Sequence, residues 1–258
     1  MNRIKLKTVV PIGPKFVITQ HRVAQVKVES NIILLSIIMF AVIYSFCSNI
    51  SFAQVTDIDG NTYKTVIIGN QEWTAENLNV SHYRNGDVIP QVQDADEWGK
   101  LTTGAWCYYE NKSENGKIYG KLYNWYAVND SRGLAPKGFH IPSASEWEQL
   151  IDSLGGVPTE FSSLILEIVG GKLKATTLWV SPNIGATNSS GFNAIPGGGR
   201  YGTPNFSDIG KFCYFWSSSG YGLAAHFYLN FSSSCIYCSI TGMENGLSVR
   251  CIKNTTEN

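Results

Sequence analysis

Residues 119–154, YGKLYNWYAVNDSRGLAPKGFHIPSASEWEQLIDSL, decide the fold class. Their second half encodes a helix with its own start and stop. Ser143 and Glu146 have the S-x-x-E spacing of a capping box, in which each side chain satisfies a backbone N–H of the first turn. Gly155-Gly156 supplies a left-handed stop. Apolar residues at i, i+3, i+4 and i+7 form one face that needs a core: Trp147, Leu150, Ile151 and Leu154.

Strand patterns lie on both sides of this block. Within it, residues 122–128 predict a second, shorter helical face. Upstream, residues 61–68 alternate polar and apolar side chains, and Gly69-Asn70 is a two-residue turn signal. The C-terminal end has four strand-like runs, at residues 212–217, 224–231, 236–240 and 247–253. We therefore expect a single loop-rich α+β domain with two or three helices, in which both ends of the mature chain build one antiparallel sheet.

Shorter patterns fill the remaining segments. They predict a helix at 94–99, a strand at 105–109, a helix at 161–169 closed by Gly170-Gly171, a strand at 177–180 and a turn at 197–199. Asp57, Asp59 and Asn61 resemble the opening of a calcium loop, but Ile68 stands at the twelfth position, where such a loop needs an acidic ligand. We therefore expect a hairpin turn at Asp59-Gly60. No cofactor is predicted, and calcium stays an alternative without support.

The first 53 residues have the composition of an export signal. Six basic residues precede an uncharged run at 32–46, which with 15 residues is short for a membrane span. Small residues at Ser51 and Ala53 predict cleavage between Ala53 and Gln54. The domain is then residues 54–258, and we expect it to be secreted or located at the cell surface. Because the basic region is long, an uncleaved signal that anchors the chain in the membrane is the alternative.

The net charge and the number of cysteines limit the partners and the disulfides that we expect for the domain. Residues 1–53 hold six basic residues and one acidic residue of the 20 and 20 in the chain, so 14 basic and 19 acidic residues remain, a net charge of −5. Such a surface has no general attraction to nucleic acid, and no nucleic-acid partner is predicted. Five cysteines remain, and an odd number leaves at least one thiol over if disulfides form.

Several short sequence segments together indicate a family because of the order in which they occur, although any one of them alone is weak evidence. They are Asp59-Gly60-Asn61-x-Tyr63, Ile68-Gly69-Asn70-Gln71-x-Trp73, Glu76-Asn77-Leu78, Tyr119-Gly120-x-Leu122-Tyr123-Asn124-Trp125, Pro142-x-x-x-Glu146-Trp147, Gly191-Phe192, Pro196-Gly197-Gly198, Phe215-Trp216-Ser217-Ser218-Ser219 and Ser248-Val249-Arg250-Cys251. With these segments, residues 56–253 resemble the Fibrobacter succinogenes major paralogous domain family of secreted bacterial proteins. The resemblance implies no settled biochemical activity.

The resemblance also implies a fold. The Pro-x-x-x-Glu-Trp helix and the Arg-Cys strand are similar to the sulfatase-modifying-factor branch of the C-type-lectin-like fold, so we expect that fold. Ser143, Glu146, Trp147 and Arg250 are then structural residues, with Arg250 pairing with an acidic group near the helix. Cys107 and Cys251 lie in short strands of the family pattern, and we expect a disulfide between them; two buried free thiols are the alternative.

Few residues in the sequence form a recognisable catalytic motif. The related formylglycine-generating enzymes bind copper through two cysteines four residues apart, whereas Cys235 and Cys238 have two residues between them. A C-x-x-C redox motif prefers a helix start, and this pair lies in a predicted strand. Glu146 is already engaged in its cap, and no Ser, His and carboxylate arrangement is visible. No catalytic residue and no metal ligand is assigned.

The predicted binding surface is aromatic and polar. Six aromatic residues lie among Ser, Asn and Gly in the C-terminal part: Tyr201, Tyr214, Trp216, Tyr221, Tyr228 and Tyr237. Aromatic rings stack on the apolar faces of sugars while polar groups add directional hydrogen bonds. The predicted ligand-binding set is Arg200, Tyr201, Trp216, Ser218 and Tyr221. A place in the core is the alternative for about half of the aromatic residues.

These observations favour an exported, non-catalytic binding module whose partner is a glycan or a surface protein. An oxidase-like or metal-dependent enzyme that uses Cys235 and Cys238 is the alternative. A third alternative is a structural surface protein without a ligand pocket. The membrane enters only through the signal segment, if that segment is retained.

Overall fold

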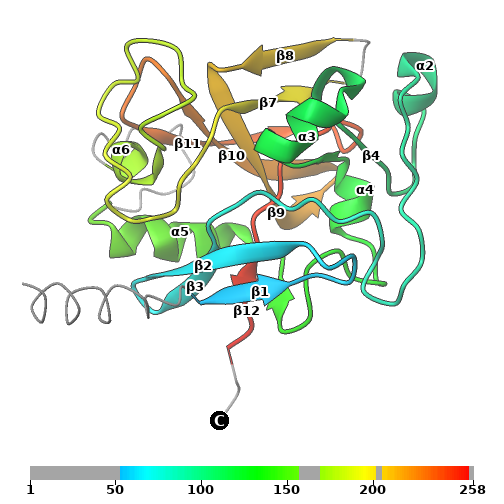
Figure 1. Cartoon of the computed structure of the whole chain (residues 1–258), viewed down its shortest axis with the longest axis horizontal. Helices are drawn as coiled ribbons and strands as arrows, with labels where there is room; N and C mark the ends of the chain where they lie inside the picture. Colours follow the sequence, from blue (N-terminus) through cyan, green and yellow to red (C-terminus); the bar gives the residue numbers. More distant parts are fainter. Residues whose placement is uncertain (1–52, 157–168, 202–204, 256–258) are drawn as a thin grey trace, which may run out of the picture. The chain divides into compact units, whose positions relative to one another are not determined.

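The computed structural model describes residues 53–156, 169–201 and 205–255. The chain divides into two units, residues 1–51 and 52–258, and the fold described here is that of the second. Two curled five-stranded sheets and several short helices give it a mixed α+β architecture (Figure 1). Within the described ranges, every helix is too short or too polar to cross a bilayer.

Both ends of the domain build the first sheet, as the sequence predicts. Its order is β1-β2-β3-β12-β6, with bounds Gln54–Thr56, Thr62–Ile68, Gln71–Thr74, Ile252–Lys253 and Phe139–His140. The last strand pairs antiparallel with the third, with Ile252 opposite Trp73. The predicted turns at Asp59-Gly60 and Gly69-Asn70 join β1 to β2 and β2 to β3, and both glycines have positive φ.

The C-terminal strands form most of the second sheet. Its order is β11-β10-β9-β7-β8, with bounds Ile236–Thr241, Leu223–Asn230, Phe212–Tyr221, Gly197–Arg200 and Phe206–Ile209. The turn predicted at 197–199 is wrong, because these glycines belong to a buried strand. A Cβ on Gly198 would collide with the Ser207 carbonyl of β8, so the glycine permits a close approach of two backbones.

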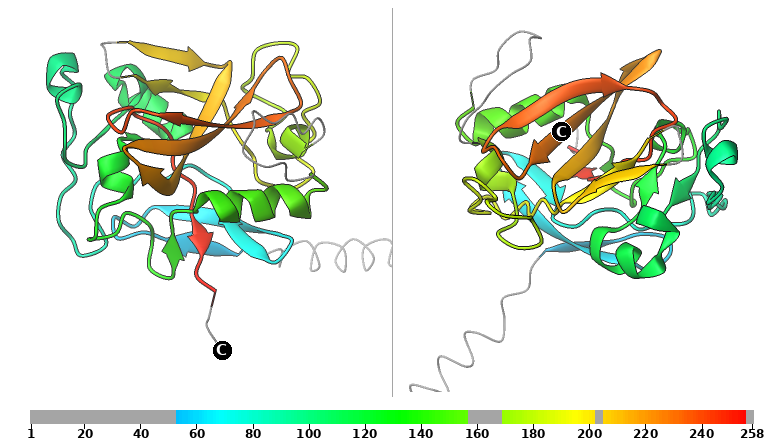
Figure 2. Two further views of the ribbon diagram at one scale, coloured as in Figure 1. Left: turned by 180° about the vertical axis from the view of Figure 1, so that it is seen from behind. Right: turned by 90° about the horizontal axis from the view of Figure 1, so that it is seen from above.

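Helix α5, Ala144–Ser153, lies between the two sheets (Figure 2). Its capping box is confirmed: Ser143 Oγ accepts from the Glu146 N–H, and the Glu146 carboxylate accepts from the Ser143 N–H. Trp147 is fully buried and joins the sheets, because its ring centroid lies 4.8 Å from that of Trp73 in β3 and 5.0 Å from that of Phe227 in β10. The helix therefore docks on the sheet that the two ends of the domain build.

The block before α5 differs from its prediction. Residues 122–128 are a strand followed by one helical turn, not one helical face: β5, Leu122–Tyr123, pairs with β4, Trp106–Cys107, and α4 spans Trp125–Val128. Asn124 causes the change, because its Oδ1 accepts from the N–H groups of Ala105 and Ala127 and so caps α4.

The other short patterns have mixed outcomes. Helix α2, Ala95–Trp98, is confirmed and is capped by Asp94. Helix α6 spans Val169–Leu173, so Gly170 and Gly171 lie inside a helix and do not close one; residues 161–168 of that prediction lie outside the described residues. Residues 177–180 are not a strand. The short helical segments without a prediction are η1, Tyr109–Asn111, and α3, Ser113–Tyr119.

Candidate functional site

Arg250 is buried, but its partners are not acidic. Its guanidinium donates from Nε to Asn77 Oδ1 at 2.7 Å and from Nη1 to the carbonyls of Thr74 and Phe192 at 2.9 and 2.7 Å. Nη2 donates to the carbonyl of Asn193 at 3.0 Å. The predicted acidic partner is therefore wrong: neutral oxygens satisfy the charge, and burial lowers the pKa of Arg250 to about 10.

The predicted disulfide between Cys107 and Cys251 is not formed, and both residues are buried free thiols. Cys107 packs in a hydrophobic cluster with Trp98 and Leu122. Cys251 belongs to a different cluster that contains Tyr63. Strands that look equivalent in sequence thus face different parts of the core. Burial raises the pKa of the Cys107 thiol to about 11 and that of Cys251 still further, which disfavours the reactive thiolate in both.

Cys235 and Cys238 are free and differ in exposure. Cys235 is buried just before β11, whereas Cys238 lies within β11 and is exposed. Partial burial, and the charge of Glu148, raise the pKa of the Cys238 thiol. A reactive cysteine needs surroundings that lower its pKa, and this position has the opposite effect.

The predicted ligand-binding set does not share one concavity. Arg200 is buried: its guanidinium lies 4.4 Å from the centroid of the Trp98 ring and donates to the carbonyls of residues 92–94. Trp216 is buried too, with its indole N–H donating to the Tyr123 carbonyl at 2.7 Å. Ser218 is half-buried, and its N–H is bonded to the Pro142 carbonyl. The side chain of Tyr221 lies outside the described residues.

Tyr201 instead belongs to a continuous set of rings on one face of the second sheet. We call this set the aromatic face; its members are Tyr201, Phe212, Tyr214, His226, Tyr228 and Tyr237. Each ring has a neighbour in the set with centroids 4.9–6.3 Å apart. Strands β9, β10 and β11 supply five of the six rings, and Tyr201 follows β7.

Three tyrosines form a row across the strands. Tyr214 lies directly opposite Tyr228, and Tyr228 lies directly opposite Tyr237. The ring centroids are 5.8 Å and 4.9 Å apart, and the second pair is stacked. Tyr214 is buried, whereas Tyr228 and Tyr237 are partly exposed. The row therefore runs from the core to the edge of the sheet.

Polar groups lie beside these rings. The hydroxyl of Tyr214 donates to Asp208 Oδ2 at 3.0 Å, and that of Tyr237 donates to Ser233 Oγ at 3.0 Å. His226 is buried, and its Nδ1 has no hydrogen-bond partner. Burial lowers the pKa of His226 to about 4, so the ring is neutral at physiological pH. The face thus combines neutral rings with hydroxyl, carboxylate and imidazole groups.

Of the aromatic face, the predicted ligand-binding set contains only Tyr201, although Tyr214, Tyr228 and Tyr237 are among the six aromatic residues that the sequence points to. A usable signal exists in the period of two along the strands. In β9, Phe212, Tyr214 and Trp216 fall at alternate positions and share one face. In β10, His226 and Tyr228 do the same. The period of two does not show which face of the sheet is covered by another element.

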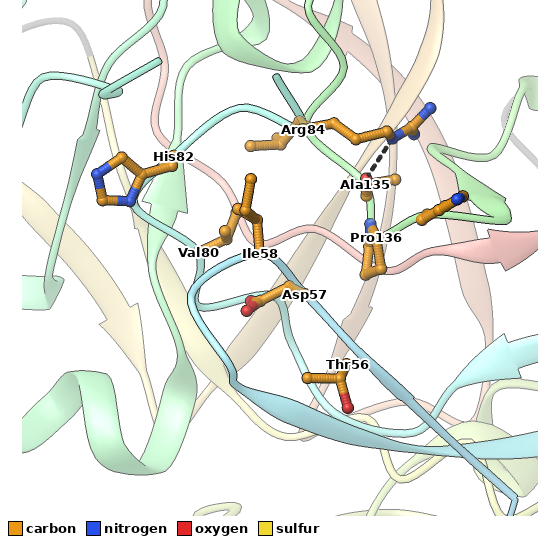
Figure 3. Close-up of a pocket in the computed structure, with 10 residues that line it drawn as sticks. Thr56, Asp57, Ile58, Val80, His82, Arg84, Ala135 and Pro136 are labelled. Carbon is orange, nitrogen blue, oxygen red and sulfur yellow. Dashed lines mark hydrogen bonds between the residues drawn. The ribbon is translucent and has the colours of Figure 1, made fainter. Parts of the chain in front are cut away.

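A separate cavity of about 250 Å³ lies beside the β1–β2 turn (Figure 3). His82 and Arg84 line it, but the imidazole and the guanidinium point to opposite sides. Arg84 is also engaged by the carbonyls of Ala135 and Phe139, at 3.0 and 2.9 Å. Because the basic groups do not converge, this cavity is a poor match for an anion.

Asp57 forms the acidic part of the same cavity, and its oxygens are occupied. Oδ1 accepts from the N–H groups of Asp59 and Asn61, and Oδ2 accepts from Asn61 Nδ2 and the Tyr63 hydroxyl. The carboxylate therefore stabilises the hairpin turn. Among the residues that the structure describes, no three His, Cys, Asp or Glu side chains are grouped as metal ligands would be.

A buried lysine lies near this turn. Lys121 Nζ donates to the Asn79 carbonyl and to Ser81 Oγ, and it lies 4.3 Å from the centroid of the Trp106 ring. Burial lowers the pKa of Lys121 to about 8, although the charges of Asp59 and Asp57 oppose the change. A lowered pKa is typical of a catalytic amine. Lys121 is only 4% exposed and its N–H groups have partners, so we assign it a structural role.

Comparison with known proteins identifies a family. A family model described as Fibrobacter succinogenes major domain (Fib_succ_major) matches residues 66–253. The matched range begins within β2 and ends with β12, so it includes strands of both sheets. No curated protein and no solved structure matches the chain.

Proposed function

The chain belongs to the Fibrobacter succinogenes major domain family, and we propose that it is an exported, non-catalytic binding module that recognises carbohydrate on its aromatic face. The basic region, apolar run and small residues before Gln54 support export to the cell surface or beyond. A C-type-lectin-like fold is supported by the sheet that both ends of the domain share and by the packing of α5 against it.

The observation that carries the proposal is the row of Tyr214, Tyr228 and Tyr237. Three adjacent strands hold these rings at fixed spacing, so little conformational entropy is lost when a ligand packs on them. The apolar face of a sugar ring packs well on an aromatic ring. Asp208 and Ser233, already bonded to tyrosine hydroxyls, place oxygens where sugar hydroxyls can donate.

The rings of this face are uncharged, which favours a sugar, and the Asp208 carboxylate beside them can accept from sugar hydroxyls. Among its described members, the only ionisable ring near neutral pH is His226, and burial keeps it uncharged. Burial also raises the pKa of Tyr214 and Tyr228, so both hydroxyls stay protonated; that of Tyr214 donates to Asp208, and that of Tyr228 can donate to a ligand. An uncharged polyol is the class of ligand that such donors and rings recognise.

The test is titration of the exported domain with soluble oligosaccharides of cellulose, xylan, chitin and β-1,3-glucan, with and without a chelator. We expect at least one series to bind in the presence of chelator. Tyr237→Ala should weaken that binding about tenfold, or roughly 1.4 kcal/mol, while Tyr237→Phe keeps most of it.

The matched control is Tyr126→Ala, which removes a partly exposed tyrosine of α4 outside the aromatic face. Its affinity should equal that of the wild type. Failure of every oligosaccharide to bind, or an unchanged affinity in Tyr237→Ala, would overturn the carbohydrate proposal.

A further inference from the structure

A second hollow of about 390 Å³ lies between the start of β2 and helix α3. Four asparagines and two opposite charges line it: Asn61, Asn77, Asn79, Asn193, Glu76 and Lys117. We call it the amide groove. It shares no lining residue with the aromatic face.

Arg250 holds two lining residues of the groove, Asn77 and Asn193, in place through hydrogen bonds. Its Nε donates to Asn77 Oδ1 at 2.7 Å, and its Nη2 donates to the Asn193 carbonyl at 3.0 Å. Asn77 Nδ2 in turn donates to the Tyr119 carbonyl at the end of α3, at 2.9 Å. Segments that are far apart in sequence are therefore held in place before any ligand arrives, which lowers the entropic cost of binding.

Two of the asparagines keep side-chain groups unpaired. Asn79 Oδ1 is buried and has no hydrogen-bond partner. Asn193 is held through its backbone, because its N–H donates to Asn188 Oδ1 and its carbonyl accepts from Arg250. Within the described residues its side-chain amide makes no hydrogen bond. The buried Asn79 oxygen is closed to a ligand and costs stability, whereas the partly exposed amide of Asn193, which lines the groove, can meet one.

Apolar side chains lie beside these amides. Ile118 and Leu178 both line the groove and are 51% and 48% exposed. Leu178 has a φ of +71°, in the left-handed region that a leucine rarely adopts. Backbone strain of this kind persists where the surrounding structure imposes it, and it concentrates at binding sites.

We propose that the amide groove binds an extended peptide segment that carries an apolar side chain. A carboxamide has a donor and an acceptor side by side, which matches the C=O and N–H of a peptide backbone. Asn193 supplies such a group, and Ile118 with Leu178 supplies the contact for the apolar side chain. A sugar would need an exposed ring to stack on, whereas Tyr63 in the lining is 3% exposed.

Segments that carry the family resemblance meet at this groove. The groove is lined by Asn61, residues 76–77 and Gly120. Arg250 donates a hydrogen bond to Asn77 and so holds this lining residue in place. Gly120 has a φ of +74°, and a Cβ there would come within 2.8 Å of the Leu78 carbonyl. The close approach of backbones at Gly120 thus helps to shape the groove.

The test is selection of a displayed library of random seven-residue peptides on the folded domain. Enriched peptides are then synthesised with a fluorophore and titrated by anisotropy. We expect the enriched sequences to share an apolar residue. Asn193→Gly should weaken their binding at least tenfold, and glycine suits the φ of +57° at that position, so the fold is kept.

Leu178→Gly provides a second variant, because it removes the apolar contact and relieves the strained backbone. It should weaken peptide binding while the thermal midpoint stays or rises. Ile67→Ala, at a 72% exposed position of β2 outside the groove, is the matched control and should bind as the wild type.

The two sites are separable by their variants. Tyr237→Ala should leave peptide binding unchanged, and Asn193→Gly should leave oligosaccharide binding unchanged. Absence of any enriched peptide that binds, equal affinity in Asn193→Gly, or displacement of the peptide by an oligosaccharide would overturn the peptide site.

Discussion

The two faces of the sheet formed by β9, β10 and β11 carry similar rings in different surroundings. On one face, Phe215 and Phe227 pack against Trp147 of α5, with centroids 5.7 and 5.0 Å away. On the other, their sequence neighbours Tyr214 and Tyr228 belong to the aromatic face. Helix α5 closes the first face, whereas rings at the edge of the second stay partly exposed. The covering element, and not the type of side chain, separates a core aromatic from one that can meet a ligand.

The largest expected effect is on the covered face. Trp147→Ala removes a ring that contacts both sheets, and we expect it to lower the free energy of unfolding by about 3–5 kcal/mol. Urea denaturation followed by fluorescence and circular dichroism measures the change. Trp147→Phe should cost much less, because the indole N–H has no hydrogen-bond partner to lose. Equal losses in the two variants would show that ring packing is not the main contribution.

A smaller effect is expected at the buried end of the aromatic face, and it depends on pH. His226 has a pKa of about 4 in the folded chain, lowered by burial from an ordinary 6.5. Between these values the unfolded chain binds the proton and the folded chain does not, so stability should fall as the pH decreases from about 6.5 to 4 and then level off. The difference corresponds to roughly 3 kcal/mol at the lower limit.

Denaturation curves between pH 4 and pH 7 measure this dependence. His226→Phe should remove the part of the slope that comes from the imidazole, because the rings of Tyr214, Trp216 and Tyr228 around it carry no charge. A variant that keeps the full slope would assign the pH dependence to other groups.

The smallest effect on stability is expected at the open edge. Tyr237→Ala removes a partly exposed ring of the edge strand, and we expect a loss below about 1 kcal/mol. The same variant is the one that should weaken oligosaccharide binding, so stability and affinity separate at this position. A loss as large as that of Trp147→Ala would place Tyr237 with the core and erase the contrast between the two faces.

Local sequence patterns predicted the elements that local interactions specify. The capping box of Ser143 and Glu146 and the turn at Gly69-Asn70 follow from hydrogen bonds and backbone preferences within a few residues. The apolar face of α5 also predicts that this side of the helix is buried, because burial removes Trp147 from water. The family resemblance also came from the sequence, through the order of its segments.

The predictions that fail involve partners outside the short segment from which each prediction is made. The pattern of residues 122–128 predicts one helical face, whereas in the structure Asn124 Oδ1 caps α4 and also accepts from the Ala105 N–H of the neighbouring segment. The glycines of residues 197–199 predict a turn, whereas in the structure they form a strand with β8 and β9 on either side. Ala105 and strands β8 and β9 lie outside the short segments on which these two predictions rest.

The candidate site divides in the same way. Composition and period are properties of short segments, so the sequence predicts that aromatic residues gather in the C-terminal strands and that an α+β core forms around α5. The packing of distant segments places Arg200 and Trp216 in the interior while Tyr228 and Tyr237 reach the surface. Burial depends on which element covers a face, and that cover is supplied by residues from other parts of the chain.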